Sequence, residues 1–195
     1  GDDDEGSNIS VLENGCDNDY GTEPTTTWDL GSAGRDVVRV AKAEDLDGDG
    51  KQEVVATSFL TQPAIVIASV SDFDLPVWTT EYVNNDIGGT APDIAAIGIG
   101  DMDGDDTPEV VLTEGATNSL VLIEATAADT YEAFVAAFPL EGKSVSVHGI
   151  ETGDANGDGF GESYIANLQG AIWVVATQDV STFTSDDIYL IADTE

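Results

Sequence analysis

Oxygen-bearing side chains recur at a fixed spacing in three short segments of the chain. Each segment follows a nine-residue pattern with acidic or amide residues at positions 1, 3, 5 and 9 and glycine at position 4. These residues are Asp45, Asp47, Asp49 and Glu53 in the first loop, Asp101, Asp103, Asp105 and Glu109 in the second, and Asp154, Asn156, Asp158 and Glu162 in the third. Alternate residues of a tight loop can converge on one centre, and hard oxygen ligands select Ca2+ over zinc or copper. The pattern therefore predicts three calcium sites.

Other residues of the loops refine this prediction. The backbone carbonyl at position 7 is a natural further ligand, and position 7 is Lys51, Thr107 or Phe160. An EF-hand would need a glutamate at position 12 and flanking helices, but the residues there are Ala56, Leu112 and Ile165. A solvated acidic turn without a metal is the structural alternative, although so many carboxylates repel one another unless a cation neutralises them.

The second and third loops depart from the first in one position each. Asp106 stands where the other two loops have glycine, and Asp tolerates a left-handed backbone better than most residues. Asn156 replaces an aspartate at position 3 of the third loop. Because the third loop carries one charge fewer, we expect it to bind calcium more weakly.

Short apolar segments recur around each loop and must position it. The first segment precedes the loop (37–40, 94–97, 145–147), and the second follows it directly (53–58, 109–113, 162–166). The third comes after a short turn (64–70, 120–124, 171–176), and the fourth lies further on (77–82, 133–138, 188–192). Each is rich in Val, Ile or aromatic residues and bounded by turn formers, which is typical of strands. Residues 127–137 could form a short helix, but Thr130, Tyr131, Phe134 and Val135 favour a strand.

The repeat of four strands per unit indicates an all-β fold. Asp45, Asp101 and Asp154 are 56 and 53 positions apart, and four short antiparallel strands per repeat are the pattern of a β-propeller blade. Segments 8–12 and 26–30 align with the third and fourth strands of a unit. We therefore expect one β-propeller-type domain over 1–195, with a half blade at 7–31 and blades at about 36–83, 92–139 and 144–193. Three and a half blades predict an open array, and a plain sandwich is the alternative.

The composition excludes several functions. The 195 residues include 39 Asp and Glu but only 5 Lys and Arg, giving a formal net charge of −34. This charge disfavours nucleic acid and a polybasic grip on anionic lipid. No apolar run approaches the ~20 residues of a membrane helix. We expect no signal peptide, because no basic n-region with an apolar h-region opens the given sequence. Disorder is rejected, because 41% of residues are hydrophobic and they lie in short β-branched runs.

Little in the sequence points to catalysis. Cys16 is the only cysteine and His148 the only histidine, and the two are far apart in the chain. A nucleophile paired with an imidazole base is therefore not expected. Trp28, Trp78 and Trp173 fit strand packing better than a sugar-binding platform. A polysaccharide-active propeller remains the enzymatic alternative.

The acidic loops resemble FG-GAP/VCBS repeats, the blades of integrin-α-type and bacterial extracellular propellers. The resemblance rests on units such as Asp45 to Val55, covers about 37–192, and is to the calcium-loop half of the repeat. It implies calcium held between the first and second strands of a blade, and an extracellular role in adhesion, ligand binding or assembly. The expected partners are a protein or glycan ligand, or copies of the chain that form an oligomer, fibre or sheath through exposed blade edges. A saline, extracellular setting is our hypothesis for the remaining acidity.

Overall fold

The computed structural model describes residues 8–11, 26–29, 38–58, 64–70, 77–84, 86–87, 93–139 and 147–193. Its strands are β1 (Asn8–Val11), β2 (Thr26–Asp29), β3 (Val38–Glu44), β4 (Glu53–Ser58), β5 (Ile65–Val70), β6 (Trp78–Asn84), β7 (Ile94–Gly100), β8 (Glu109–Glu114), β9 (Ser119–Ala127), β10 (Thr130–Ala137), β11 (Val147–Gly153), β12 (Glu162–Asn167), β13 (Ala171–Ala176) and β14 (Ile188–Asp193). Two 3-10 turns, η1 (Val180–Thr182) and η2 (Ser185–Asp187), join β13 to β14. Cys16 lies outside the described residues. Of the half blade expected at 7–31, the structure describes only residues 8–11 and 26–29.

The strands form three four-stranded antiparallel sheets and one two-stranded sheet. Their orders are β3-β4-β5-β6, β7-β8-β9-β10, β11-β12-β13-β14 and β1-β2, so neighbours in the chain are neighbours in each sheet. The predicted all-β class and the four-strand unit are confirmed, and β10 confirms a strand rather than a helix over 130–137. The two 3-10 turns were not predicted from the sequence.

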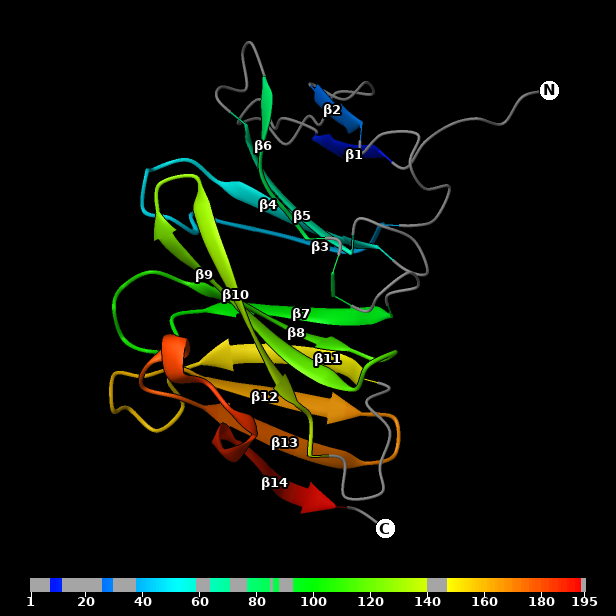
Figure 1. Cartoon of the computed structure of the whole chain (residues 1–195), viewed down its shortest axis with the longest axis vertical. Helices are drawn as coiled ribbons and strands as arrows, with labels where there is room; N and C mark the ends of the chain where they lie inside the picture. The colour runs from blue at the N-terminus through cyan, green and yellow to red at the C-terminus, as the bar shows by residue number, and fades with distance from the viewer. Residues whose placement is uncertain are drawn as a thin grey trace, which may run out of the picture.

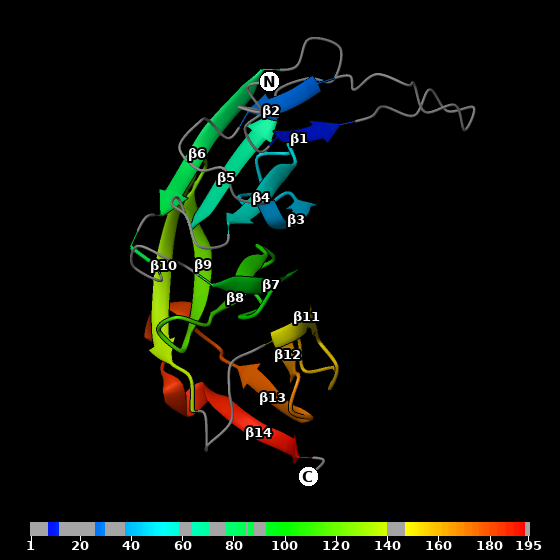
Figure 2. The same cartoon turned by 90° about the vertical axis from the view of Figure 1, so that its right-hand side faces the viewer.

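The three large sheets follow one another along the long axis of the molecule (Figure 1). The first strands lie together, because β7 packs against both β3 and β11. The fourth strands β6, β10 and β14 lie on the outer side, and the described sheets form an arc (Figure 2). The arrangement is blade-like, and closure into a propeller stays a prediction.

Burial follows from this stacking. Every residue of β8 is buried, because the second sheet lies between the first and the third (Figure 1). Every residue of β5 is buried as well. In β13 buried and half-buried residues alternate, as expected for a strand covered mainly on one face. The apolar side chains between the second and third sheets include Trp173, whose ring centroid lies 5.0 Å from that of Phe138. This position confirms the packing role expected for Trp173.

Close approach of the first strands requires small residues. A Cβ atom at Gly98 of β7 would lie 2.6 Å from Ile150 Cγ2 of β11 and 2.7 Å from Thr152 Oγ1. Glycine therefore sets how near the second and third sheets can lie. None of the described residues forms a helix long and apolar enough to cross a membrane.

Candidate metal centres

Each acidic loop is the connection between the first and second strands of a large sheet. The loops join β3 to β4, β7 to β8 and β11 to β12. The position-9 glutamate begins the second strand and pairs with the last residue of the first, as Glu53 does with Glu44. The hairpin therefore brings position 9 back beside position 1, which is the arrangement that a loop-bound cation requires.

The position-1 aspartate organises the turn. In the first loop, Gly48 N and Gly50 N donate to the two Asp45 carboxylate oxygens at 2.9 and 3.1 Å. The other loops repeat this pair of bonds, to Asp101 and to Asp154. Position 6 needs a left-handed backbone, with φ of 88° at Gly50 and 94° at Gly159. Asp106 adopts the same region with φ 72°, as expected for an aspartate in that place.

The position-9 glutamates lie inside the protein. Glu53 is 1% exposed and Glu109 0%. One carboxylate oxygen of each accepts a hydrogen bond from the position-2 backbone, Leu46 N at 2.7 Å and Met102 N at 2.6 Å. The other oxygen, Oε1, is buried and accepts no hydrogen bond from any residue that the structure describes. An ionised oxygen in such a place costs free energy unless a positive group compensates it.

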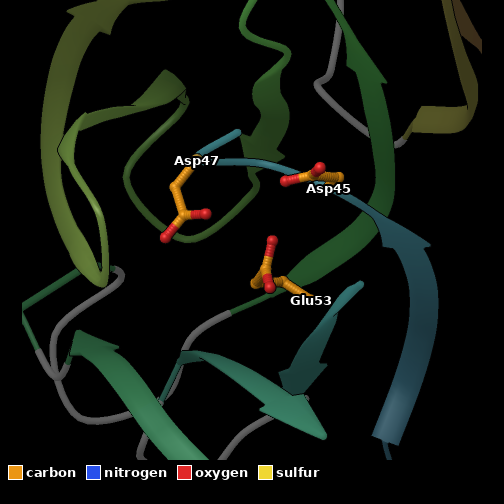
Figure 3. Close-up of side chains that lie close together, drawn as sticks. All are labelled: Asp45, Asp47 and Glu53. Atoms are coloured by element: carbon orange, nitrogen blue, oxygen red, sulfur yellow. The ribbon is translucent and has the colours of Figure 1, made fainter. Parts of the chain in front are cut away.

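Three carboxylates converge in each loop. The groups are Asp45, Asp47 and Glu53 in the first loop, Asp101, Asp103 and Glu109 in the second, and Asp154, Asp158 and Glu162 in the third. In each group, one oxygen per residue lies within 4.8 Å of the others. Figure 3 shows the Glu53 carboxylate directed toward the space between Asp45 and Asp47. Each group is close enough to hold a metal ion.

Burial and mutual repulsion alter the acidity of these groups. Burial raises the pKa of Glu53 to about 7, with a smaller contribution from Glu81, Asp47 and Asp49. Burial likewise raises the pKa of Glu109 to about 8, and the charges of Asp103, Asp105 and Asp101 add to the shift. The pKa of Asp103 is also raised, chiefly by burial. Both glutamates therefore favour the protonated form in the absence of a cation.

The third loop satisfies its glutamate differently. Asn156 Nδ2 donates to Glu162 Oε1 at 2.6 Å, and Asn156 Oδ1 accepts from Asp158 N at 2.8 Å. The two bonds fix the orientation of the Asn156 amide. Glu162 Oε2 accepts from Ala155 N at 3.0 Å. Both carboxylate oxygens of Glu162 thus have a partner within the loop itself.

The remaining predicted ligands take other positions. Asp49 groups with Asp47 and Asp129, and Asp105 joins none of the described three-residue groups. The position-7 residues donate their backbone N–H to the position-5 aspartate at 2.7 to 3.0 Å, from Lys51, Thr107 and Phe160. The use of their carbonyls as ligands stays a prediction.

One acidic neighbour was missed in the sequence. Asp129 lies in the turn between β9 and β10, and its N–H donates to Asp47 Oδ2 at 2.6 Å across 82 positions. The corresponding contact to the second loop comes from Val180 N, 3.5 Å from Asp103 Oδ2. The only sequence signal is that both residues precede the fourth strand of the following unit. The aspartate at position 3 thus links each of these two loops to the next four-strand unit.

Comparisons with protein-family models, with curated proteins and with solved structures give no match for this chain. The functional argument therefore rests on the residues and geometry of the loops.

Proposed function

We propose that the chain is a non-catalytic, calcium-stabilised module of the β-propeller type that acts outside the cell in adhesion, ligand binding or assembly. The resemblance of its loops to FG-GAP/VCBS repeats supports the extracellular role. Three blade-like sheets with an acidic hairpin loop in each support the structural role.

The proposal rests on the buried Oε1 atoms of Glu53 and Glu109, which have no hydrogen-bond partner in the described part of the chain. They occupy the same position in two loops, and each belongs to a group with two aspartates. Oxygen ligands of this kind suit Ca2+, whose 6 to 8 ligands are carboxylates, carbonyls and waters, whereas Mg2+ needs near-ideal octahedral geometry. Asp45, Asp47 and Glu53 would hold one ion, and Asp101, Asp103 and Glu109 a second. The third loop, with its internally paired glutamate, would bind more weakly.

Binding to these loops would stabilise the fold. Calcium supplies the positive charge that the clustered carboxylates lack, and a ligand that binds only the folded state raises stability by mass action. Each loop fixes the first and second strands of its sheet. Leu46 and Met102, at position 2 of the first two loops, are buried in the cores between the sheets. Ordering a loop therefore also holds the packing between sheets.

Calorimetric titration with CaCl2 and MgCl2 tests the proposal. We expect two calcium sites of higher affinity and weak or no magnesium binding. Asp47→Asn should remove one of the two sites and Asp103→Asn the other, while Asp186→Asn, at an exposed position in η2, should leave both. Absence of calcium binding to the unaltered chain would refute the proposal.

Self-assembly is a second candidate, favoured by the outer face of the third sheet. Tyr189 is 51% exposed and Ile191 56%. Tyr189 pairs with Val174, which in turn pairs with Tyr164, and both are half-buried. These side chains alternate with the core-facing Trp173 and Val175, so an apolar face points away from the core. A second copy could cover it. Sedimentation at rising concentration should then show oligomers for the unaltered chain and monomers for Tyr189→Lys.

A further inference from the structure

The first loop has a carboxylate of the next sheet in one of its acidic groups, which neither of the other loops has among the described residues. Asp129, from the β9–β10 turn of the second sheet, donates its N–H to Asp47 Oδ2 at 2.6 Å. Carboxylate oxygens of Asp47, Asp49 and Asp129 also lie within 4.8 Å of one another. Asp47 therefore belongs both to the loop group with Asp45 and Glu53 and to a group that crosses between two sheets.

An independent feature marks this place as one that takes a cation. Glu53 is 1% exposed, and its Oε1 has no hydrogen-bond partner among the described residues. The Glu53 carboxylate points toward the space between Asp45 and Asp47 (Figure 3). The same interface holds Glu81 of β6, whose Oε2 accepts from Tyr131 Oη at 3.0 Å. Glu81 Oε1 is buried and likewise accepts no bond from a described residue. Buried acidic groups are thus concentrated between the first two sheets beyond what the loop alone contributes.

Among the described residues, the positive side chain of Lys51 lies near this acidic group but compensates only one of its carboxylates. The Lys51 ammonium forms an ion pair with Asp49 Oδ2, and the Lys51 N–H donates to Asp49 Oδ1. Lys51 therefore satisfies Asp49. Within the described part of the chain, this single charge leaves Asp47, Glu53 and Asp129 without an equivalent positive partner.

We propose that the cation of the first loop takes a further carboxylate ligand from Asp129, so that the ion joins the first and second four-stranded sheets. This inference rests on the proposed calcium binding and adds a residue of the neighbouring sheet to the first site. Its consequence is that calcium would fix the relative position of two sheets as well as the shape of one hairpin.

The other two loops are not expected to share this property. In the second loop, Asp103 receives the Val180 N–H of the third sheet at 3.5 Å. The neighbouring carboxylate, that of Asp179, already accepts from Ser181 N at 3.0 Å and from Ser181 Oγ. It caps η1 and joins none of the described groups of carboxylates. The third loop has no following sheet within the described residues. The bridge is therefore specific to the first loop.

Substitution of Asp129 separates the bridge from the loop site. Asp129 has φ 56°, and asparagine tolerates that backbone, so Asp129→Asn should fold and keep the N–H bond to Asp47. Asp129→Gly is a second variant that also suits a positive φ and removes every side-chain ligand. Glu132→Gln, at an exposed position on β10, loses the same charge away from the loop and is the matched control. All are made in the Glu109→Gln background, so that calcium titration reports mainly on the first loop.

Calorimetry and amide hydrogen exchange are then measured with CaCl2 and with EDTA. We expect Asp129→Asn and Asp129→Gly to weaken first-loop binding by about tenfold or more, and Glu132→Gln to leave it unchanged. Calcium should slow exchange in the β9–β10 turn of the background protein, and this protection should disappear in both Asp129 variants while loop 45–53 stays protected. Affinity and turn protection equal to those of the control would overturn the bridge and leave the loop site intact. Failure of the background protein and the unaltered chain to bind calcium would overturn the proposed function as well.

Discussion

Asn156 Nδ2 lies 2.6 Å from Glu162 Oε1 and donates a hydrogen bond to it. The equivalent Oε1 atoms of Glu53 and Glu109 accept none from the described residues. Where position 3 is asparagine, the loop supplies hydrogen bonds to both oxygens of its buried glutamate. Where position 3 is aspartate, the Oε1 atom has no such donor among the described residues, and we propose that a cation takes that place. The residue at position 3 therefore distinguishes the two loops whose glutamate has a buried oxygen without a described partner from the loop whose glutamate is fully hydrogen-bonded.

Asn156→Asp should convert the third loop to the behaviour of the first two. Loss of the amide bond to Glu162 should destabilise the protein in EDTA by about 1 to 3 kcal/mol, because a donor is replaced by a second negative charge. In saturating calcium the variant should gain a third high-affinity site. Thermal unfolding and calcium titration measure the two effects. Asn118→Asp, at an exposed turn position with φ 53°, makes the same change of charge away from the loops. Equal behaviour of the two variants would contradict the role given to Asn156.

Glu109→Gln should have opposite effects with and without calcium. At about pH 9 in EDTA, where the buried carboxylate is ionised, a neutral amide should stabilise the protein by about 1 to 3 kcal/mol. In calcium the same variant should be less stable than the unaltered chain, because a ligand of the second loop is weakened. Urea unfolding in both buffers gives the comparison. A variant that is less stable by the same amount in both buffers would show that Glu109 acts only by packing.

The pKa values of Glu53 and Glu109 predict a specific pH dependence. Both are raised from an ordinary value of 4.5, to about 7 and about 8. Between pH 4.5 and about 8, the folded, metal-free protein therefore binds more protons than the unfolded chain. This contribution to stability is fully present below pH 4.5 and is lost as the pH rises through 7 and 8. Because calcium binds the ionised form, its apparent affinity should rise over the same interval.

Urea unfolding in EDTA and calcium titration across this pH range test both trends. The Glu53→Gln/Glu109→Gln double variant should lose the decline of metal-free stability between pH 4.5 and 8. An equally steep decline in the double variant would assign the effect to other groups.

Gly98→Ala should separate the second and third sheets. The added methyl group would meet Ile150 Cγ2 at 2.6 Å, and overpacking of this kind costs about 1 to 3 kcal/mol. Gly149→Ala on β11 is the control, because a Cβ there meets nothing within 4 Å. The control should be neutral or slightly stabilising. Urea unfolding measures both, and equal stabilities would contradict the close packing of β7 on β11.

The local pattern of the chain predicted most of the strands. Residues 53–58 and 171–176 were expected as strands and form β4 and β13 with those bounds, because β-branched runs bounded by turn residues depend little on distant contacts. The convergence of three carboxylates in each loop followed from spacing in the same way, and the left-handed Asp106 from its side chain.

Features that depend on packing between sheets were not predictable. Asp129 stands in a turn without a motif, and its contact with Asp47 exists only because two sheets lie side by side. The hydrogen bond from Asn156 to Glu162 was also missed. The sequence showed one charge fewer at that position, but the direction of an amide depends on the folded loop. The 3-10 turns before β14 have N-caps at Asp179 and Thr184. A single Asp or Thr in the sequence is only a weak indication of such a turn.

The most direct test of calcium-dependent stability is thermal unfolding of the unaltered chain in EDTA, and then after calcium is restored in excess. Two sites at one hundred times their Kd would each add about 2.7 kcal/mol, so Tm should rise by about 10 °C or more on addition of calcium, and magnesium should not replace it. Superimposable melting curves in EDTA and in calcium would contradict the account.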